Sequence, residues 1–423
     1  MRWGRLTIAV ALALGGRGAL AFHEGGVAAC EGCHSMHGDP DASKSGPNLL
    51  VASDPSSTCL QCHATTGPGT YQVYTSNVMS GIVPQQYTPG GDFARLQRTF
   101  LWPNAKGTTE TSPGERHGHS IVAQDYGLAA DSVNLTSPGG SYPSDRLTCI
   151  SCHDPHGRYR QLSDGSITSS GTPTFASGSY GGMDLKTPFP GFSVGTYRLL
   201  GGVGYLPKSA GAVQPFFSPP PVALAPWSYN RSERVTETRV AYGTGMSEWC
   251  QNCHANIHAT SDPSQTFKHP VGASARLATG GEFSIYNNYI RTGVLTGAQA
   301  TSYTSLVPYE EGLANRTVLA QHAVSDGTQT SGPTTGGENV MCLSCHRAHA
   351  TGWDHALRWN MPQSGTITFG SSWPGVDAIG DARLPANAQG RLQAETRAAM
   401  YDRDPSIYSA YQKTLCNKCH AQD

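Results

Sequence analysis

The sequence predicts a mostly irregular fold with short α-helices and few strands, and with too few apolar side chains for an ordinary core. Leu, Ile, Val and Phe make up 71 of the 423 residues, about 17%. Gly and Pro contribute 50 and 28 residues, which favours turns over long helices. Charged residues are only 14% and the net charge is −1, so the composition is not that of a disordered chain. Disulfides, metals or cofactors must therefore complete the core.

This composition also excludes two broad classes. A self-sufficient enzyme domain would need more apolar residues, and a nucleic-acid-binding protein would need a basic excess.

Residues 1–21 have the pattern of a cleaved signal peptide. Arg2 and Arg5 are followed by a short apolar run from Leu6 to Leu14, and Ala19 and Ala21 form an A-x-A cleavage site. The apolar run is too short to span a bilayer. We therefore expect an exported protein without a transmembrane segment, whose mature chain covers residues 22–423.

All twelve cysteines belong to six C-x-x-C-H motifs, which is the attachment signature of c-type haem. Two thiols one helical turn apart can bond one porphyrin, and the following histidine can reach its iron. The expected thioether residues are Cys30, Cys33, Cys59, Cys62, Cys149, Cys152, Cys250, Cys253, Cys342, Cys345, Cys416 and Cys419. The expected proximal iron ligands are His34, His63, His153, His254, His346 and His420.

Other interpretations of the cysteines explain less of the pattern. A C-x-x-C pair can be half of a zinc site or a redox dithiol, and an exported chain can hold six disulfides. None of these explains why a histidine follows the second cysteine in all six pairs. The sequence therefore predicts a multihaem cytochrome c wrapped around a chain of six stacked haems, which supply the missing core.

The motifs have no constant spacing, and no boundary between two cores is evident, so we expect residues 22–423 to form a single elongated domain. Helices should concentrate near the motifs. Asp404 and Pro405 suit the cap and first turn of a helix, and a second helix is expected over residues 391–401. The first of these helices should continue into the last motif on an apolar stripe formed by Ile407, Tyr408, Tyr411 and Leu415.

The second axial ligand of each haem decides its function. A second histidine gives a low-potential, closed electron carrier, methionine raises the potential, and a vacant position admits substrate. Of the 16 histidines, ten remain after the six proximal ligands, so six bis-histidine haems are the simplest expectation. These ten are His23, His37, His117, His119, His156, His258, His269, His322, His349 and His355.

Four of the ten closely follow a motif. His37, His156 and His349 come three residues after their proximal histidine, and His258 comes four residues after. They share a helix face with the proximal ligand, so they cannot reach the far side of their own haem, and we expect them to serve another haem nearby.

The remaining candidates differ in their surroundings. His119 and His269 lie among turn residues, whereas His117 and His355 are expected to be solvated surface histidines.

Long flanking stretches around the motifs carry a family resemblance. They include FHEGGVAACEGCHSMHG at 22–38, RVAYGTGMSEWCQNCHANIH at 239–258 and CLSCHRAHATG at 342–352. The chain resembles the hexahaem outer-surface c-type cytochromes that polymerise into extracellular filaments, or microbial nanowires, in metal-reducing bacteria. The resemblance extends from residue 22 to the end of the chain.

The resemblance implies that all six haems are bis-histidine. It also implies that His37 is an inter-subunit ligand of the neighbouring subunit's fifth haem, which corresponds to Cys342, Cys345 and His346. His117 and His355 have no counterparts. The six distal ligands would come from eight positions with counterparts: His37, His119, His156, His269, His322, His349, His23 and His258.

The sequence as a whole favours an electron-transfer protein rather than an enzyme. We expect a homopolymer with head-to-tail contacts that conducts electrons from haem to haem toward external acceptors, such as minerals or partner cells. One alternative is a monomeric periplasmic or outer-surface shuttle that exchanges electrons with other redox proteins. Another is a multihaem nitrite or hydroxylamine reductase. Such enzymes usually need an open haem, sometimes held by C-x-x-C-K, and that motif does not occur here.

Overall fold

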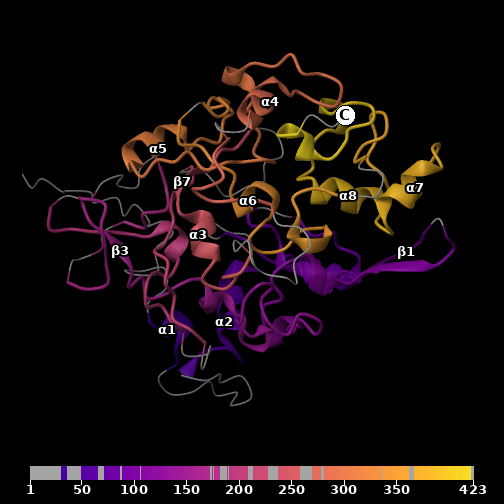
Figure 1. The fold of residues 1–423 in the computed structure, drawn as a ribbon. Helices are drawn as coiled ribbons and strands as arrows, with labels where there is room; N and C mark the ends of the chain where they lie inside the picture. Colours follow the sequence, from indigo (N-terminus) through magenta and orange to yellow (C-terminus); the bar gives the residue numbers. More distant parts are fainter. Residues whose placement is uncertain are drawn as a thin grey trace, which may run out of the picture.

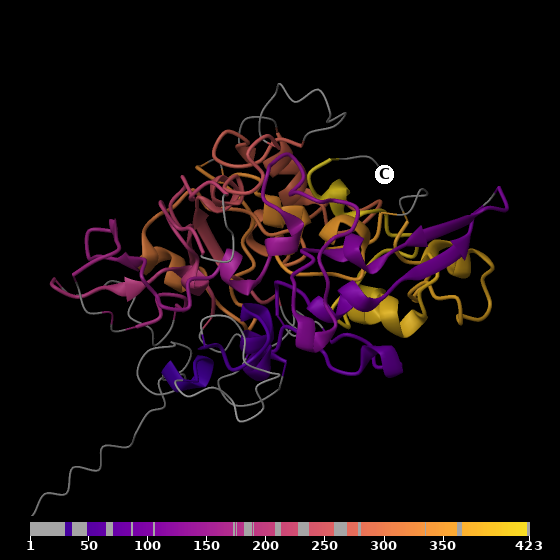
Figure 2. The same ribbon diagram turned by 90° about the horizontal axis from the view of Figure 1, so that it is seen from below.

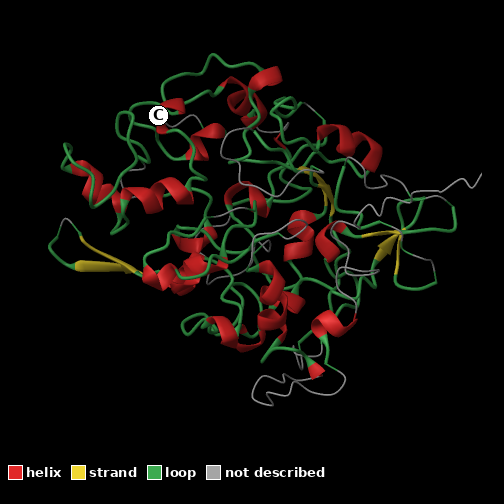
Figure 3. Ribbon diagram, turned by 180° about the vertical axis from the view of Figure 1, so that it is seen from behind, coloured by secondary structure: helices red, strands yellow, loops and turns green. Residues whose placement is uncertain are grey.

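Loops make up most of the fold, and short helices and a few strands are distributed along them (Figure 3). The computed structural model describes residues 30–35, 49–64, 71–85, 88–104, 106–171, 174, 176–181, 188, 190–207, 213–226, 237–257, 269–277, 281–334, 336–361 and 366–420. The longest helix in these ranges has nine residues. The expectation of a mostly irregular fold is therefore confirmed.

A helix overlaps each of the six C-x-x-C-H motifs, but most helices lie in the segments between motifs, so the expected concentration of helices near the motifs is only partly confirmed (Figure 1). The α-helices are Cys30–Cys33 (α1), Pro55–His63 (α2), Met246–Cys250 (α3), Glu282–Asn288 (α4), Arg316–His322 (α5), Cys342–Cys345 (α6), Arg383–Ala388 (α7) and Gln393–Ala399 (α8). The 3-10 helices are Val78–Ser80 (η3), Phe93–Gln97 (η4), Gly114–His117 (η5), Gln124–Tyr126 (η6), Ser144–Arg146 (η7), Cys149–Ser151 (η8), Tyr197–Leu199 (η9), Gln299–Thr301 (η12), Asp354–Ala356 (η13), Pro405–Ile407 (η14) and Leu415–Lys418 (η15).

The strands form three small antiparallel sheets. β1 (Phe100–Pro103) pairs with β2 (Thr109–Ser112), and this hairpin extends from one side of the molecule beside the C-terminal helices (Figures 1 and 2). β3 (Arg160–Gln161) lies between β4 (Ile167–Thr168) and β5 (Val194–Gly195). β6 (Val222–Leu224) pairs with β7 (Ala241–Thr244), with a register shift at Val222 and Ala223.

The core of the described residues is divided into clusters, most of which pack against motif cysteines. The first, around Trp353 and Trp359, includes Cys345, Cys416 and Cys419 at its edge. A second, around Leu60 and Phe93, packs against Cys149, and a third, around Tyr180 and Tyr242, packs against Cys152. Apolar side chains thus gather around the motifs.

Two helix expectations near the C-terminus have opposite outcomes. The helix expected over residues 391–401 is present as α8, Gln393–Ala399. The continuous helix expected from Asp404 to Cys416 is wrong. Asp404 does cap Ser406, but η14 ends at Ile407 and the chain is extended at Tyr408. The following segment pairs with residues 366–370 instead, because the amide of Ile367 donates to the carbonyl of Gln412 at 2.7 Å. This tertiary pairing overrides the helical pattern.

No helix among the described residues is both long and apolar enough to cross a membrane. The expected signal peptide, residues 1–21, lies outside the described residues, so its cleavage stays a prediction. The single-domain organisation of residues 22–423 also stays a prediction.

Candidate haem-binding sites

Each C-x-x-C-H motif is built on a helical turn. The motifs are numbered 1 to 6 in chain order, and motif 2 lies wholly within α2. In the other five, the amide of the proximal histidine donates to the carbonyl of the first cysteine at 2.8–3.1 Å. Both thiols and the imidazole therefore start from one turn, as attachment to one porphyrin requires. All twelve cysteines are described, and none is disulfide-bonded.

The six motifs follow one another in space in their sequence order. The thiols of Cys59 and Cys149 lie close enough to shift each other's pKa, and so do those of Cys250 and Cys342. The other consecutive motifs meet at thiols that lie within electrostatic reach of one another: Cys33 and Cys62, Cys152 and Cys253, and Cys345 and Cys416. Burial, with a smaller effect of these neighbours, raises the pKa of Cys33, Cys152 and Cys345. The attachment turns thus form one continuous line.

The two closest junctions along this line have the same construction. Helix α2 packs against η8 at the junction of motifs 2 and 3, and α3 packs against α6 at the junction of motifs 4 and 5 (Figure 1). At each junction a buried serine of the first helix accepts a hydrogen bond from the first cysteine's amide of the next motif.

The odd-numbered motifs share a second feature. Each has the form C-x-x-C-H-x-x-H, and its proximal histidine forms an isolated β-bridge with a leucine: Leu50 for His34, Leu200 for His153 and Leu357 for His346. The residue before each leucine has a positive φ, namely 60° at Leu49, 54° at Leu199 and 55° at Ala356. Left-handed backbone is uncommon for such residues. The fold therefore repeats one turn at motifs 1, 3 and 5.

Backbone carbonyls orient the proximal imidazoles. Nδ1 of His63 donates to the carbonyl of Tyr71 at 2.9 Å, and Nδ1 of His254 donates to that of Pro138 at 2.8 Å. The same bond joins His153 to Arg198 and His346 to His355, both at 2.7 Å. A proton fixed on Nδ1 leaves Nε2 free to bind a metal.

Four proximal imidazoles lie opposite a second imidazole. The ring centroids are 6.4 Å apart for His34 and His156, 6.4 Å for His153 and His349, 6.1 Å for His254 and His119, and 6.0 Å for His420 and His269. The angles between the ring planes are 7°, 67°, 42° and 76°, respectively. Each pair joins the histidine of a motif to one of the expected distal candidates.

These separations fit two imidazoles on opposite sides of one metal ion. A metal–nitrogen bond of about 2 Å, plus about 1 Å from the nitrogen to the ring centre, gives about 6 Å between the two centroids. Burial lowers the pKa of His254 and brings that of His349 to about 3. Both imidazoles are therefore neutral at neutral pH, and the neutral form is the one that binds iron. The residues present fit a six-coordinate haem.

The other expected histidines have varied positions. His23, His37 and His258 lie outside the described residues. His322 ends α5, and its Nδ1 donates to Glu311 Oε2 at 2.5 Å, a carboxylate contact typical of metal-binding histidines. His355 is exposed, as expected.

The expectation of a solvated surface position for His117 is wrong. Its side chain is fully buried, because Arg95, Ser112 and Asp354 surround it. Burial, together with the charge of Arg391, lowers the pKa of His117 to about 3.

The imidazole pairs and the line of attachment turns define this chain as a multihaem c-type cytochrome. No protein-family model matches it. It is 45% identical to the C-type cytochrome OmcS of Geobacter sulfurreducens, covering 98% of this chain and 97% of the relative. The chain therefore belongs to the OmcS family of c-type cytochromes.

Two solved structures have the same fold. A cryo-EM structure of the OmcS nanowires from Geobacter sulfurreducens matches with a TM-score of 0.85 and 44% identity, covering 95% of this chain and 100% of that chain. An outer membrane cytochrome S filament from Geobacter sulfurreducens matches with a TM-score of 0.84 and 45% identity, over the same shares.

Proposed function

We propose that this chain is the subunit of an extracellular filament that carries electrons over long distances along covalently bound haems. The family membership supports this proposal, since the similar solved structures are filaments and this chain covers the whole length of their subunits. Haem supplies reversible one-electron chemistry when bound. The protein fixes the spacing, closes each iron to other ligands and leaves the coordination unchanged between the two oxidation states. The role is electron transfer rather than enzyme catalysis.

Six haems would be attached, one to each motif, each with two histidine ligands. The imidazole pairs support His156, His349, His119 and His269 as the distal ligands for motifs 1, 3, 4 and 6. The distal ligand for motif 2 would come from His23, His258 or His322.

A regular step in these pairs supports polymerisation. The second histidine of motif 5, His349, lies opposite the proximal histidine of motif 3, His153. The second histidine of motif 3, His156, lies opposite the proximal histidine of motif 1, His34. In both cases the last histidine of a C-x-x-C-H-x-x-H motif lies opposite the proximal histidine of the motif two positions earlier in the chain. The same step from motif 1 takes His37 beyond its own subunit, to the fifth motif of a preceding one.

This step is the observation on which the proposal depends most. Among the described residues, no imidazole forms such a pair with His346, the proximal histidine of motif 5. His37 of a neighbouring subunit would complete that site. A chain of head-to-tail contacts that each supply one ligand is an open filament.

Replacing His37 tests the polymer against the monomeric shuttle. In the exported holoprotein, His37→Ala should leave one haem in six without its sixth ligand, and electron cryomicroscopy of material sheared from cells should show no filaments. Lys106→Ala is the control, because Lys106 is exposed in the loop between β1 and β2 and belongs to no motif. Filaments with fully low-spin spectra in the His37→Ala variant would instead favour a ligand from within the chain.

A further inference from the structure

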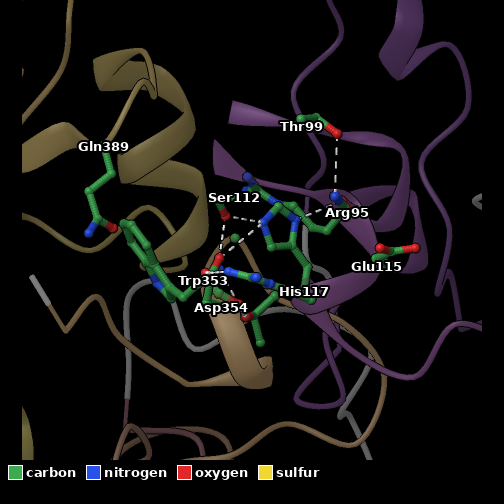
Figure 4. Close-up of polar contacts among 12 residues, drawn as sticks. Arg95, Thr99, Ser112, Glu115, His117, Trp353, Asp354 and Gln389 are labelled. Atoms are coloured by element: carbon green, nitrogen blue, oxygen red, sulfur yellow. Dashed lines mark hydrogen bonds and ion pairs between the residues drawn. The ribbon is translucent and has the colours of Figure 1, made fainter. Parts of the chain in front are cut away.

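A buried cluster beside the β1–β2 hairpin connects parts of the chain that are far apart in sequence. Nδ1 of His117 donates to the carbonyl of Arg95 at 2.9 Å, and its Nε2 lies 2.9 Å from Ser112 Oγ. The Ser112 hydroxyl also contacts Asp354 Oδ1. Figure 4 shows His117 between Ser112, Arg95 and Asp354. Ser112, His117 and Asp354 are called the His117 cluster below.

Arg391, just before α8, closes this cluster from the C-terminal side. Its Nη2 donates to Ser112 Oγ at 3.3 Å, and its Nε donates to the carbonyl of Gly352 at 2.7 Å. The guanidinium lies over the rings of Phe100 and Trp353, at 4.3 and 4.8 Å from their centroids. The cluster is therefore held by the hairpin, by the segment after motif 5 and by the start of α8.

The backbone next to His117 fixes two of the paired imidazoles against each other. The amide of His119 donates to the carbonyl of His349, and the amide of Thr351 donates to the carbonyl of His117, both at 2.9 Å. Gly118 permits this approach, since a Cβ there would lie 2.1 Å from the carbonyl oxygen of His349. A shift of His117 must move His119 and His349 together.

Asp354 extends the connection to a third imidazole. It begins η13, whose next residue, His355, has a φ of 61° and presents its carbonyl to Nδ1 of His346 at 2.7 Å. The amide of Arg347 also donates to the carbonyl of Ala356 in this turn. The contact between Ser112 and Asp354 thus anchors the turn that orients His346.

We propose that the His117 cluster positions the axial imidazoles His119, His349 and His346, so that one buried contact network sets the ligand orientation at motifs 3, 4 and 5. His117 is a positioning residue, because it does not itself face a proximal imidazole. The inference rests on the ligand pairs in the proposed function. Partners of metal-binding histidines commonly set ring orientation and tune the metal.

Electron paramagnetic resonance of the oxidised holoprotein tests this role, because the signal of a low-spin bis-histidine haem depends on the angle between its two imidazole planes. In His117→Phe, which keeps a buried ring without its polar contacts, the signals of the 42° and 67° pairs should shift. The signal of the 7° pair, His34 with His156, should not. Ser112→Ala and Asp354→Asn should shift the same signals, and His117→Gln, whose amide can face Ser112, should partly restore them.

Thr111→Ala is the matched control, because Thr111 directly precedes Ser112 on β2 and its side chain is exposed. Signals unchanged in all three disrupting variants would overturn the proposal, and so would a change of every signal at once, the 7° pair included. Failure of the ligand pairs themselves is distinguishable. If the ligand pairs were wrong, His119→Ala and His349→Ala would produce no high-spin haem. The His117 cluster variants are instead judged by the positions of the low-spin signals.

Discussion

The hydroxyl of Ser56 accepts a hydrogen bond of 3.0 Å from the amide of Cys149, across 93 positions of sequence. Ser247 and Cys342 repeat this relationship at 3.0 Å across 95 positions. Both serines are fully buried, and each lies three residues before the first cysteine of its own motif. In both cases, the helical turn that precedes one motif therefore binds the backbone at the first cysteine of the next motif.

Removing one of these hydroxyls should destabilise the junction between two motifs. Ser247→Ala removes the buried hydroxyl that accepts this part-buried hydrogen bond from the Cys342 amide, which costs about 1–3 kcal/mol. Thermal unfolding of the holoprotein, followed by circular dichroism in the haem absorption band, measures the loss. Ser166→Ala is the control, because that hydroxyl bonds Asp164 on the exposed surface. Equal melting temperatures for the two variants would contradict the prediction.

Gly118→Ala should separate the two backbone segments that carry His119 and His349. The new Cβ meets the carbonyl oxygen of His349 at 2.1 Å, and a rigid backbone cannot move aside cheaply. We expect a loss of at least about 1–3 kcal/mol of stability, as for other overpacked sites, together with altered spectra of the haems at motifs 3 and 4. Melting temperature and haem spectra provide the measurement. In Gly336→Ala the nearest contacts are the side-chain ends of Glu338 and Thr334, both at 3.3 Å, so that variant should resemble the wild type.

Glu310 should make the stability of the protein depend on pH. Burial raises the pKa of this carboxyl to about 7, although the amide of Met246 and the side chain of Asn339 donate to it. The folded state then holds a proton that the unfolded state loses near pH 4.5. The proton on Glu310 therefore adds at most about 3 kcal/mol to the free energy of unfolding. This stabilisation is complete below pH 4.5 and is lost as the pH rises through 7.

Melting temperatures of the wild type and of Glu310→Gln, measured between pH 5 and 8, test this expectation. The wild type should lose stability relative to the variant across that range. Parallel curves for the two proteins would show that Glu310 does not titrate there.

Lys418 places a buried cation inside the last motif. Its Nζ donates to the carbonyl of Tyr289 at 2.8 Å and lies 4.4 Å from the ring centroid of Tyr286. Burial lowers the pKa of Lys418 to about 8, so the amine is charged at pH 6. A positive charge near an iron favours the reduced state, so Lys418→Met should lower the potential of one haem. Spectroelectrochemical titration at pH 6 measures this shift. The exposed Lys106→Met removes the same charge at a distance and should leave the titration unchanged.

The sequence predicts those features that depend on local spacing. The turn at each C-x-x-C-H motif and the helix Gln393–Ala399 follow from residue order, and so does the interpretation of His156 and His349 as ligands for another motif. The structure brings these two histidines opposite His34 and His153.

Features that depend on distant partners were not predictable from the sequence. The burial of His117 requires Arg95 and Asp354, which no local pattern connects to it. The carbonyls that orient His153 and His346 belong to Arg198 and His355, and a carbonyl has no side-chain signature. The backbone at Arg198 and His355 has a positive φ, and only a glycine at these positions would have indicated this conformation in the sequence.

The two-motif step between His349 and His153, and between His156 and His34, has a consequence for any polymer of this chain. Every interior subunit both gives a histidine to one neighbour and receives one from the other. Of the two terminal subunits, one only gives a histidine and the other only receives one. Whatever its length, a filament would then contain one incompletely ligated iron at a single end, and each break would create one more. The proportion of such irons in bulk material would fall inversely with the number of subunits, which makes it an end-group measure of mean filament length.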